Sequence, residues 1–161
     1  MSFESFREDL QRHIPELTAV RPLDYAVSGR HLEIQAESDQ VEAIARAARK
    51  SGLFIEAITA LDFTEGPQVV YFFNSYDAPS RVQVRVQLKP EESLATISRI
   101  YDAALWYERE VFDLFGVRFD NHPDLRRLLL PEDADFHPLR KDFGKVRAFR
   151  NAKEIYGEPA A

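Results

Sequence analysis

Hydrophobic residues recur along this chain with two spacings that change from segment to segment. From Arg81 to Leu88 every second residue is apolar, which is typical of an antiparallel strand with one face in the core and the other in water. Leu53–Phe63 and Gln68–Tyr76 are rich in aromatic and β-branched residues and are joined by a Gly66-Pro67 turn. These three segments predict an antiparallel meander that forms most of a sheet.

The segments before this meander predict a helix and a hairpin. Ser2–Ile14 carries apolar residues three or four positions apart, as an amphipathic helix does. Ala19–Val27 and His31–Ala36 are expected to be strands, and Ser28-Gly29 is expected to turn the chain between them.

Two further helices are expected before and after the meander. The first should begin at Asp39, where Glu42 completes a capping box, and end before Gly52. The second should open at Pro90 and is free to continue or bend into the helix after Trp106, because no breaker separates them. Its core stripe would consist of Leu94, Ile97, Ile100 and Tyr101.

The region from Trp106 to Phe143 combines charged and large apolar residues more densely than a plain surface or a plain core needs. Helical periodicity covers Tyr107–Phe115, and Gly116 is placed to close that helix in a left-handed cap. Asn121–Asp124 is a turn cluster, after which a basic and extended arm is expected.

Together these elements predict an α+β fold in which about three helices pack on a mainly antiparallel sheet, with an extended basic C-terminal arm. A chain of 161 residues, 45% of them hydrophobic, can form one such domain, which we place at residues 1–143. The tail, residues 144–161, spreads its basic residues among single apolar ones: Lys145, Arg147, Arg150 and Lys153. Such a tail is either disordered or orders in an acidic groove of a partner, and we expect order in a complex.

Helical geometry divides the charged residues of the last predicted helix between two faces. At about 100° per residue, Arg109, Glu110 and Asp113 lie on one face with Trp106, and Glu108 lies opposite, among apolar residues. Glu108 and Glu110 therefore point about 200° apart and cannot act as acid and base on one substrate.

Glu108 needs a partner if this geometry holds. A carboxylate among apolar side chains must take up a proton or meet a cation, because an unpaired buried charge costs several kcal/mol. We expect it to pair with Arg126 or Arg127 within a folded-back lattice of ion pairs. The alternative is a solvated helix face with incidental pairs.

Composition restricts the classes of function. The net charge of −6 argues against a general nucleic-acid binder, which needs a basic surface. Without cysteine the chain cannot bind an iron–sulfur cluster through thiolates or form a disulfide. No apolar run approaches the roughly 20 residues that span a bilayer, and the acidic start is unlike a signal peptide, so we expect a soluble, cytoplasmic chain.

No arrangement of residues typical of catalysis is apparent. The histidines have no two-ligand spacing on one helix face, and cysteine is absent, so a metal site is not expected. No glycine-rich phosphate loop follows a predicted strand. We therefore do not expect the chain to be catalytic alone.

Two motifs in the last third of the chain resemble one family. The first motif begins with Glu-Arg-Glu at 108–110, and it continues with Asp-Leu-Phe at 113–115, His122, Arg126 and Leu-Leu at 128–129. The second motif is His-Pro-Leu-Arg-Lys-Asp-Phe at 137–143. Both are similar to signatures of the 30 kDa subunit, or C subunit, of proton-pumping NADH:quinone oxidoreductase, respiratory complex I. The residues that the resemblance assigns to the motifs and to partner docking are Glu108, Arg109, Glu110, Asp113, His122, Arg126, Arg127, His137, Arg140, Lys141 and Asp142.

This resemblance implies a cofactor-free structural subunit in the peripheral arm of the complex. It would dock on the D subunit, which helps form the quinone pocket, with the I and B subunits close by. Flavin and iron–sulfur clusters would be carried by partner subunits, which would also bind NADH and quinone. The resemblance places the chain on the cytoplasmic face of a bacterial inner membrane, associated with the membrane only through the complex.

Two alternatives remain open. The chain could be an enzyme acting on an acidic small molecule, with Arg126, Arg127, Arg140 and Lys141 as its anion site. It could also be the equivalent subunit of a membrane-bound energy-converting hydrogenase, or of a quinone reductase with another electron donor. The sequence Ala134-Asp135-Phe136 departs from the usual pattern of the family around the second motif.

Overall fold

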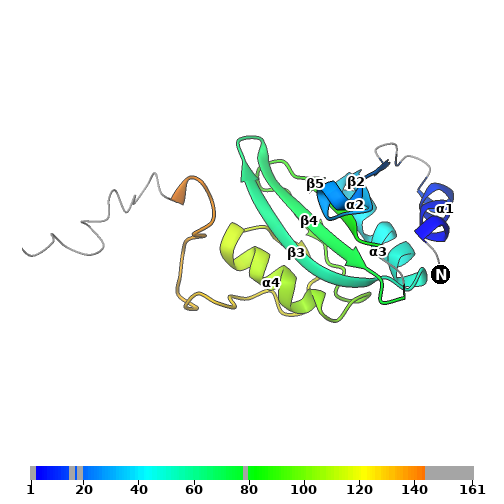
Figure 1. Ribbon diagram of the computed structural model, residues 1–161. Coiled ribbons are helices and arrows are strands. Elements are labelled where there is room, and N and C mark those ends of the chain that lie inside the picture. The colour runs from blue at the N-terminus through cyan, green and yellow to red at the C-terminus, as the bar shows by residue number, and fades with distance from the viewer. Residues whose placement is uncertain (1–2, 15–16, 18–19, 78–79, 144–161) are drawn as a thin grey trace, which may run out of the picture.

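A mixed five-stranded sheet forms the centre of the structure, a computed structural model that describes residues 3–14, 17, 20–77 and 80–143 (Figure 1). Its strands, in spatial order, are β1 (Val20–Pro22), β2 (Leu32–Ala36), β5 (Val82–Gln87), β4 (Gly66–Asn74) and β3 (Phe54–Phe63). Neighbouring strands are antiparallel except β2 and β5, which are parallel. The predicted α+β class is confirmed, and the predicted meander is β3, β4 and β5.

The register of the meander explains which side chains enter the core. Tyr71 of β4 pairs with Ile58 of β3 and with Val84 of β5, and all three are buried. Because side chains alternate between the faces of a strand, this register directs one face of the sheet toward the helices.

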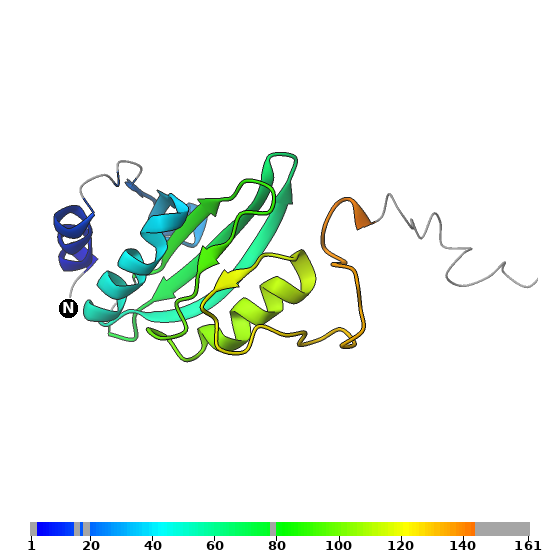
Figure 2. The same ribbon diagram turned by 180° about the vertical axis from the view of Figure 1, so that it is seen from behind.

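Helices α3 (Val41–Lys50) and α4 (Ala104–Phe115) cover the same face of the sheet, the near side in Figure 2. Helix α1 (Phe3–His13) packs against α3. Their apolar stripes join the sheet in one core, to which α1 contributes Phe6 and Leu10. No helix in the described ranges is long and apolar enough to cross a membrane.

The helix expected from Pro90 is not formed. The chain instead makes strand β6 (Leu94–Ala95), which pairs in parallel with β7 (Phe119–Asp120), and then a series of turns before α4. The Thr96 N–H donates to the carbonyl of Asp120 at 3.0 Å. Three residues of the expected stripe, Leu94, Ile97 and Tyr101, are nevertheless buried. The apolar spacing therefore predicted correctly that the segment packs into the core, but not its secondary structure.

The hairpin predicted from Ala19–Val27 and His31–Ala36 has the expected antiparallel pairing, but its first strand is shorter than predicted. β1 and β2 are antiparallel, but the first strand ends at Pro22, and the chain then forms the short helix α2 (Tyr25–Ser28). Asp24 caps α2 by accepting from the Ala26 N–H at 2.9 Å, and Gly29 ends it at φ +67°. Residues 25–28 therefore form a helical turn capped by Asp24 instead of the end of the predicted strand.

Two smaller expectations also need correction. The turn before α3 is the 3₁₀ helix η1 (Ser38–Gln40), and its capping box is formed by Glu37 and Gln40 instead of Asp39 and Glu42. On β5, Gln83 is buried instead of facing water, and Arg30 donates to its amide oxygen. Residues 144–161, for which we expect order in a complex, lie outside the described residues.

Candidate functional site

Helix α4 and the segment that follows it bring the predicted site residues together. Gly116 ends α4 in the left-handed region at φ +80°. After β7, residues 121–143, here called the arm, return along α4 and pass its C-terminal end (Figure 1). The charged residues of α4 meet the arm along this path.

Asp113 is the principal contact between α4 and the arm. Its side chain is fully buried, and Oδ2 accepts from the backbone N–H groups of Leu128, Leu129 and Leu130 at 3.1, 2.7 and 2.9 Å. Burial alone would raise the pKa of Asp113, but these N–H groups and Arg127 outweigh it and hold the pKa below its usual value. Asp113 thereby fixes the backbone of three consecutive arm residues.

Arg127 joins two segments of the arm, at residues 127 and 134, to the end of α4. Its Nη1 lies 3.1 Å from Asp113 Oδ1 and donates to the Asp113 carbonyl at 2.9 Å. Its Nη2 donates to the carbonyl of Ala134 at 2.6 Å. The expected lattice of ion pairs is therefore present, with Asp113 as the partner of Arg127.

Arg109 holds the start of the arm from the other side. This buried guanidinium donates to the carbonyls of Arg126 at 3.2 Å and Arg127 at 2.7 Å, and it stacks over the ring of Trp106 at 5.2 Å. Its closest carboxylate contact, to Asp124, is long at 3.9 Å. Arg109 therefore binds mainly arm carbonyls, and the alternative of a solvated helix face does not hold for this residue.

Glu108 is fully buried, as its helical position predicted, but the predicted pairing with Arg126 or Arg127 is wrong. Its carboxylate accepts from the hydroxyl of Thr96 and from the backbone N–H of Ile97, the latter at 2.8 Å. Burial raises the pKa of Glu108 to about 7, against the opposing effect of these two hydrogen bonds. The carboxyl therefore ties the turns before α4 to the helix, and it does so without a cation.

His122 lies beside Glu108 but does not neutralise it. The two side chains are 3.9 Å apart and both are buried. Nε2 of His122 lies 3.2 Å from the Leu105 carbonyl, and Nδ1 accepts from the Asp124 N–H at 3.1 Å, which together assign the neutral Nε2–H tautomer. Burial lowers the pKa of His122, in keeping with an uncharged ring.

His137 holds the far end of the arm against the end of α4. Its ring packs edge-on against Phe112, and Nδ1 lies 2.9 Å from the Asp113 carbonyl. A Cβ atom at Gly116 would lie only 2.8 Å from the His137 ring, so this glycine is required both by its φ and by the ring above it. Leu139 N–H then donates to the Leu114 carbonyl at 3.0 Å.

Residues 34–148 match the family described as "Respiratory-chain NADH dehydrogenase, 30 Kd subunit". The chain belongs to this family. The resemblance expected from the two motifs is therefore confirmed.

Relatives within this family cover the chain to different extents. It is 32% identical to the C subunit of NADH-quinone oxidoreductase from Parvibaculum lavamentivorans over 94% of this chain and 82% of the relative. It is 45% identical to the corresponding protein of Cereibacter sphaeroides over 63% of this chain. In that case the match spans about half of the relative, 55% of its length.

Two solved structures share the fold of this family member. The trypsin-resistant fragment of Nqo5 is 27% identical, with a TM-score of 0.61 over 75% of this chain and 99% of the fragment. A chain of the membrane-bound sulfane sulfur reductase, an archaeal respiratory membrane complex, has a TM-score of 0.74 over 96% of this chain and 92% of its own length. Its identity of 23% limits that likeness to the fold.

The remaining motif residues of the family lie nearer the surface. Arg126 pairs with Asp124 at 2.9 Å, and Arg140 pairs with Asp142 at 3.1 Å. Glu110 is half-buried on α4. The side chain of Lys141 is exposed, and its backbone N–H donates to Asp62 of β3 at 2.7 Å.

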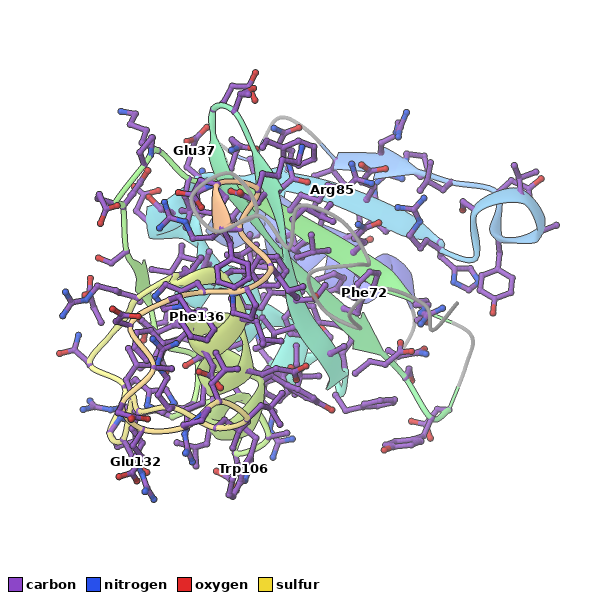
Figure 3. The ribbon with its side chains drawn as sticks, turned by 90° about the vertical axis from the view of Figure 1, so that its left-hand side faces the viewer. Glu37, Phe72, Arg85, Trp106, Glu132 and Phe136 are labelled. Atoms are coloured by element: carbon purple, nitrogen blue, oxygen red, sulfur yellow. The ribbon has the colours of Figure 1, made fainter. Side chains whose placement is uncertain are left out.

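Several large apolar side chains around the α4–arm contact remain exposed. Trp106 is 59% exposed and Phe136 37%, and Figure 3 shows Trp106 projecting from the body of the molecule. On the arm, Leu129 is 64% and Leu139 51% exposed. The buried Asp113 thus fixes the backbone of the arm while apolar side chains such as Leu129 point outward. This arrangement is suited to binding a protein surface.

Two partners of the site were not predicted from the sequence. Thr96 was missed because its segment was expected to be helical, and Asp62 was missed because it lies 79 residues before the arm residue that it binds. Among the described residues, no group of three or more histidine, aspartate or glutamate side chains is arranged to hold a metal ion.

Proposed function

We propose that this chain is a cofactor-free structural subunit in the peripheral arm of a proton-pumping NADH:quinone oxidoreductase. It would dock through α4 and the arm on the D subunit, which helps form the quinone pocket, with the I and B subunits nearby. NADH, quinone, flavin and iron–sulfur clusters would be bound by those partners and by other subunits. The chain would lie on the cytoplasmic face of a bacterial inner membrane and reach the membrane only through the complex.

One observation carries this proposal: Asp113 binds three consecutive arm amides while the Leu129 side chain, in the middle of them, points into solvent. An arm held in one conformation loses little entropy when it binds, so its exposed side chains can contribute most of their burial energy to affinity. Membership in the family supports this use of the arm, because relatives that are 45% and 32% identical are named as subunits of an oxidoreductase.

The charged residues of the site support docking better than catalysis. Arg126, Arg127 and Arg140 each have a carboxylate partner within the chain, so they do not form a free anion site. Asp113 and Arg109 are likewise engaged by the arm. The alternative of an enzyme for an acidic small molecule therefore has less support from this geometry.

A second candidate is the equivalent subunit of another membrane-bound complex, such as an energy-converting hydrogenase or a quinone reductase with a different electron donor. Its support is the shared fold with a chain of the membrane-bound sulfane sulfur reductase. The same arm would dock in either complex. Identification of the electron donor of the intact complex distinguishes the two candidates.

Docking through the arm predicts a specific loss of binding. Leu129→Asp and Leu139→Asp should each raise the Kd for the D subunit at least about tenfold, because a charge would be buried at the centre of the contact. The measurement is titration calorimetry with the isolated subunits. Val27→Asp is the matched control, since Val27 is 87% exposed on α2, outside the α4–arm contact, and its Kd should change less than about twofold. Equal weakening by all three variants, or by none, would contradict docking through the arm.

The absence of cofactors is a separate prediction. The purified chain should contain no iron or flavin, because it has no cysteine and no predicted phosphate-binding loop. Metal analysis and visible absorption of the protein measure this directly. Stoichiometric iron or flavin would show that the chain has a redox role of its own.

A further inference from the structure

A basic groove lies at the end of the molecule where β3 begins, away from the arm. Its volume is about 870 Å³, and it is open to solvent. The last turns of α3, the first residues of β3, the start of the segment after β4 and the turn before α4 form its walls. Its lining includes four cations and one carboxylate: Arg46, Arg49, Lys50, Arg99 and Asp102.

The charge of this groove contrasts with that of the chain, which carries a net −6. Two of the four cations are neutralised internally, since Arg46 pairs with Glu42 and Lys50 lies 3.5 Å from Asp9. Within the described part of the chain, Arg49 and Arg99 form no ion pair with a carboxylate, and Arg49 instead stacks over the Tyr101 ring at 5.7 Å. Two guanidinium groups from different elements are therefore available to one ligand.

An aromatic wall stands beside these cations. The rings of Phe54 and Tyr76 are stacked, with centroids 4.1 Å apart and planes 18° from parallel. Tyr76 is 86% exposed, and Ile100 nearby is half-buried. A large stacked aromatic surface in water beside unpaired guanidinium groups is typical of a recognition site rather than of a solvated helix end.

We propose that this groove binds an acidic segment of another protein, in which carboxylates flank an apolar or aromatic residue. The carboxylates would meet Arg49 and Arg99, whose planar forks suit bidentate pairing, and the apolar residue would pack on Tyr76. Nucleic acid fits less well, because its affinity requires many phosphate contacts along a basic surface. An anionic membrane would need a flat basic face instead of a recess.

This site is independent of the proposed docking through the arm. Phe54 lies at the groove, whereas Asp62, eight residues along the same strand, binds Lys141 of the arm. A strand of that length separates the two by about 26 Å. Variants at Arg49, Arg99 and Tyr76 should therefore leave the contact between Asp62 and Lys141 unchanged.

The test is titration of the full chain with a labelled, end-blocked peptide, Glu-Glu-Tyr-Glu-Glu, followed by fluorescence anisotropy and by backbone amide shifts. The double variant Arg49→Gln with Arg99→Gln should raise the Kd at least about tenfold, and Tyr76→Ser about threefold or more. The matched control is Arg7→Gln with Arg118→Gln, which makes the same change in net charge at exposed arginines outside the groove. It should change the Kd less than about twofold.

Three results would overturn the proposal. The first is equal weakening by the two double variants, which would show binding to the overall charge. The second is equal binding of a Gln-Gln-Tyr-Gln-Gln peptide. The third is stronger binding, at the same residues, of phosphatidylserine vesicles or of single-stranded DNA than of the acidic peptide.

Discussion

Replacing the fully buried Asp113 by alanine should lower the free energy of unfolding by about 3–5 kcal/mol, because it leaves the half-buried Arg127 guanidinium without its carboxylate partner. Three backbone N–H groups of the arm would also lose their acceptor. The arm should then separate from α4, and amide exchange at residues 128–130 should become faster. Urea unfolding and hydrogen exchange measure the two effects.

Glu110→Ala is the control on the same helix. Glu110 is half-buried at the surface of α4, so its removal should cost less than about 1 kcal/mol. Asp113→Asn should lie between the two, because one amide oxygen can still accept arm N–H groups but the charge opposite Arg127 is gone. Equal, small losses for all three variants would mean that Asp113 does not hold the arm.

The contribution of Asp113 also has a defined pH dependence. Its pKa in the folded state is lower than its ordinary value of 3.8, although burial opposes this, because the arm N–H groups and Arg127 favour the charged form. A lowered folded pKa gives stability that is complete above the unfolded pKa and is lost as the pH falls through the folded value. Acid should therefore release the arm of the wild-type protein and have little further effect on Asp113→Ala.

The elements that the sequence predicted well are those determined by local periodicity. Strict alternation over Arg81–Leu88 identified β5, and the apolar stripe ending before Gly52 identified α3. The end of α4 was predictable because glycine readily adopts the left-handed conformation, φ +80°, that closes the helix at Gly116. The parallel pairing of β2 with β5 was not predictable, since strand order depends on contacts between distant segments.

The site shows the same division between local and distant causes. Helical geometry was sufficient to bury Glu108, because its position on the helix depends only on neighbouring residues. Its partners were not predictable, because Thr96 and Ile97 reach it through the pairing of β6 with β7. Asp113 was placed on a charged face, and only the path of the arm buries it.

Glu108→Gln should make the protein more stable than wild type at pH 8 and nearly equal to it at pH 4.5. Burial raises the pKa of Glu108 from 4.5 to about 7 in the folded protein. Between these two values the folded state binds the proton that the unfolded state has released, so wild-type stability falls as the pH rises through this range. The full difference is about 3 kcal/mol, reached above pH 7.

Glutamine at position 108 cannot ionise, so the variant does not lose this stability as the pH rises, and its side chain keeps the geometry of the site. In the wild type, the Ile97 N–H and the Thr96 hydroxyl donate to the Glu108 carboxylate. The oxygen of glutamine can accept from the Ile97 N–H, and its NH₂ group can donate to the oxygen of Thr96. His122, 3.9 Å away, supplies no compensating charge above pH 7, because burial holds its pKa below the ordinary value of 6.5. Burial, and then the charge of Glu108, raise the pKa of Tyr71, whose hydroxyl is buried without a hydrogen-bond partner among the described residues.

The measurement is the difference in unfolding free energy between Glu108→Gln and wild type, from urea titrations at several pH values between 4.5 and 8. Comparison at each pH cancels the titration of groups that lie far from Glu108. Glu110→Gln, at the helix surface, should differ from wild type by less than about 1 kcal/mol throughout. If the difference for Glu108→Gln also stays constant across this range, Glu108 titrates in the folded protein as it does in the unfolded chain, and a cation or water supplies the compensation that Thr96 and Ile97 do not.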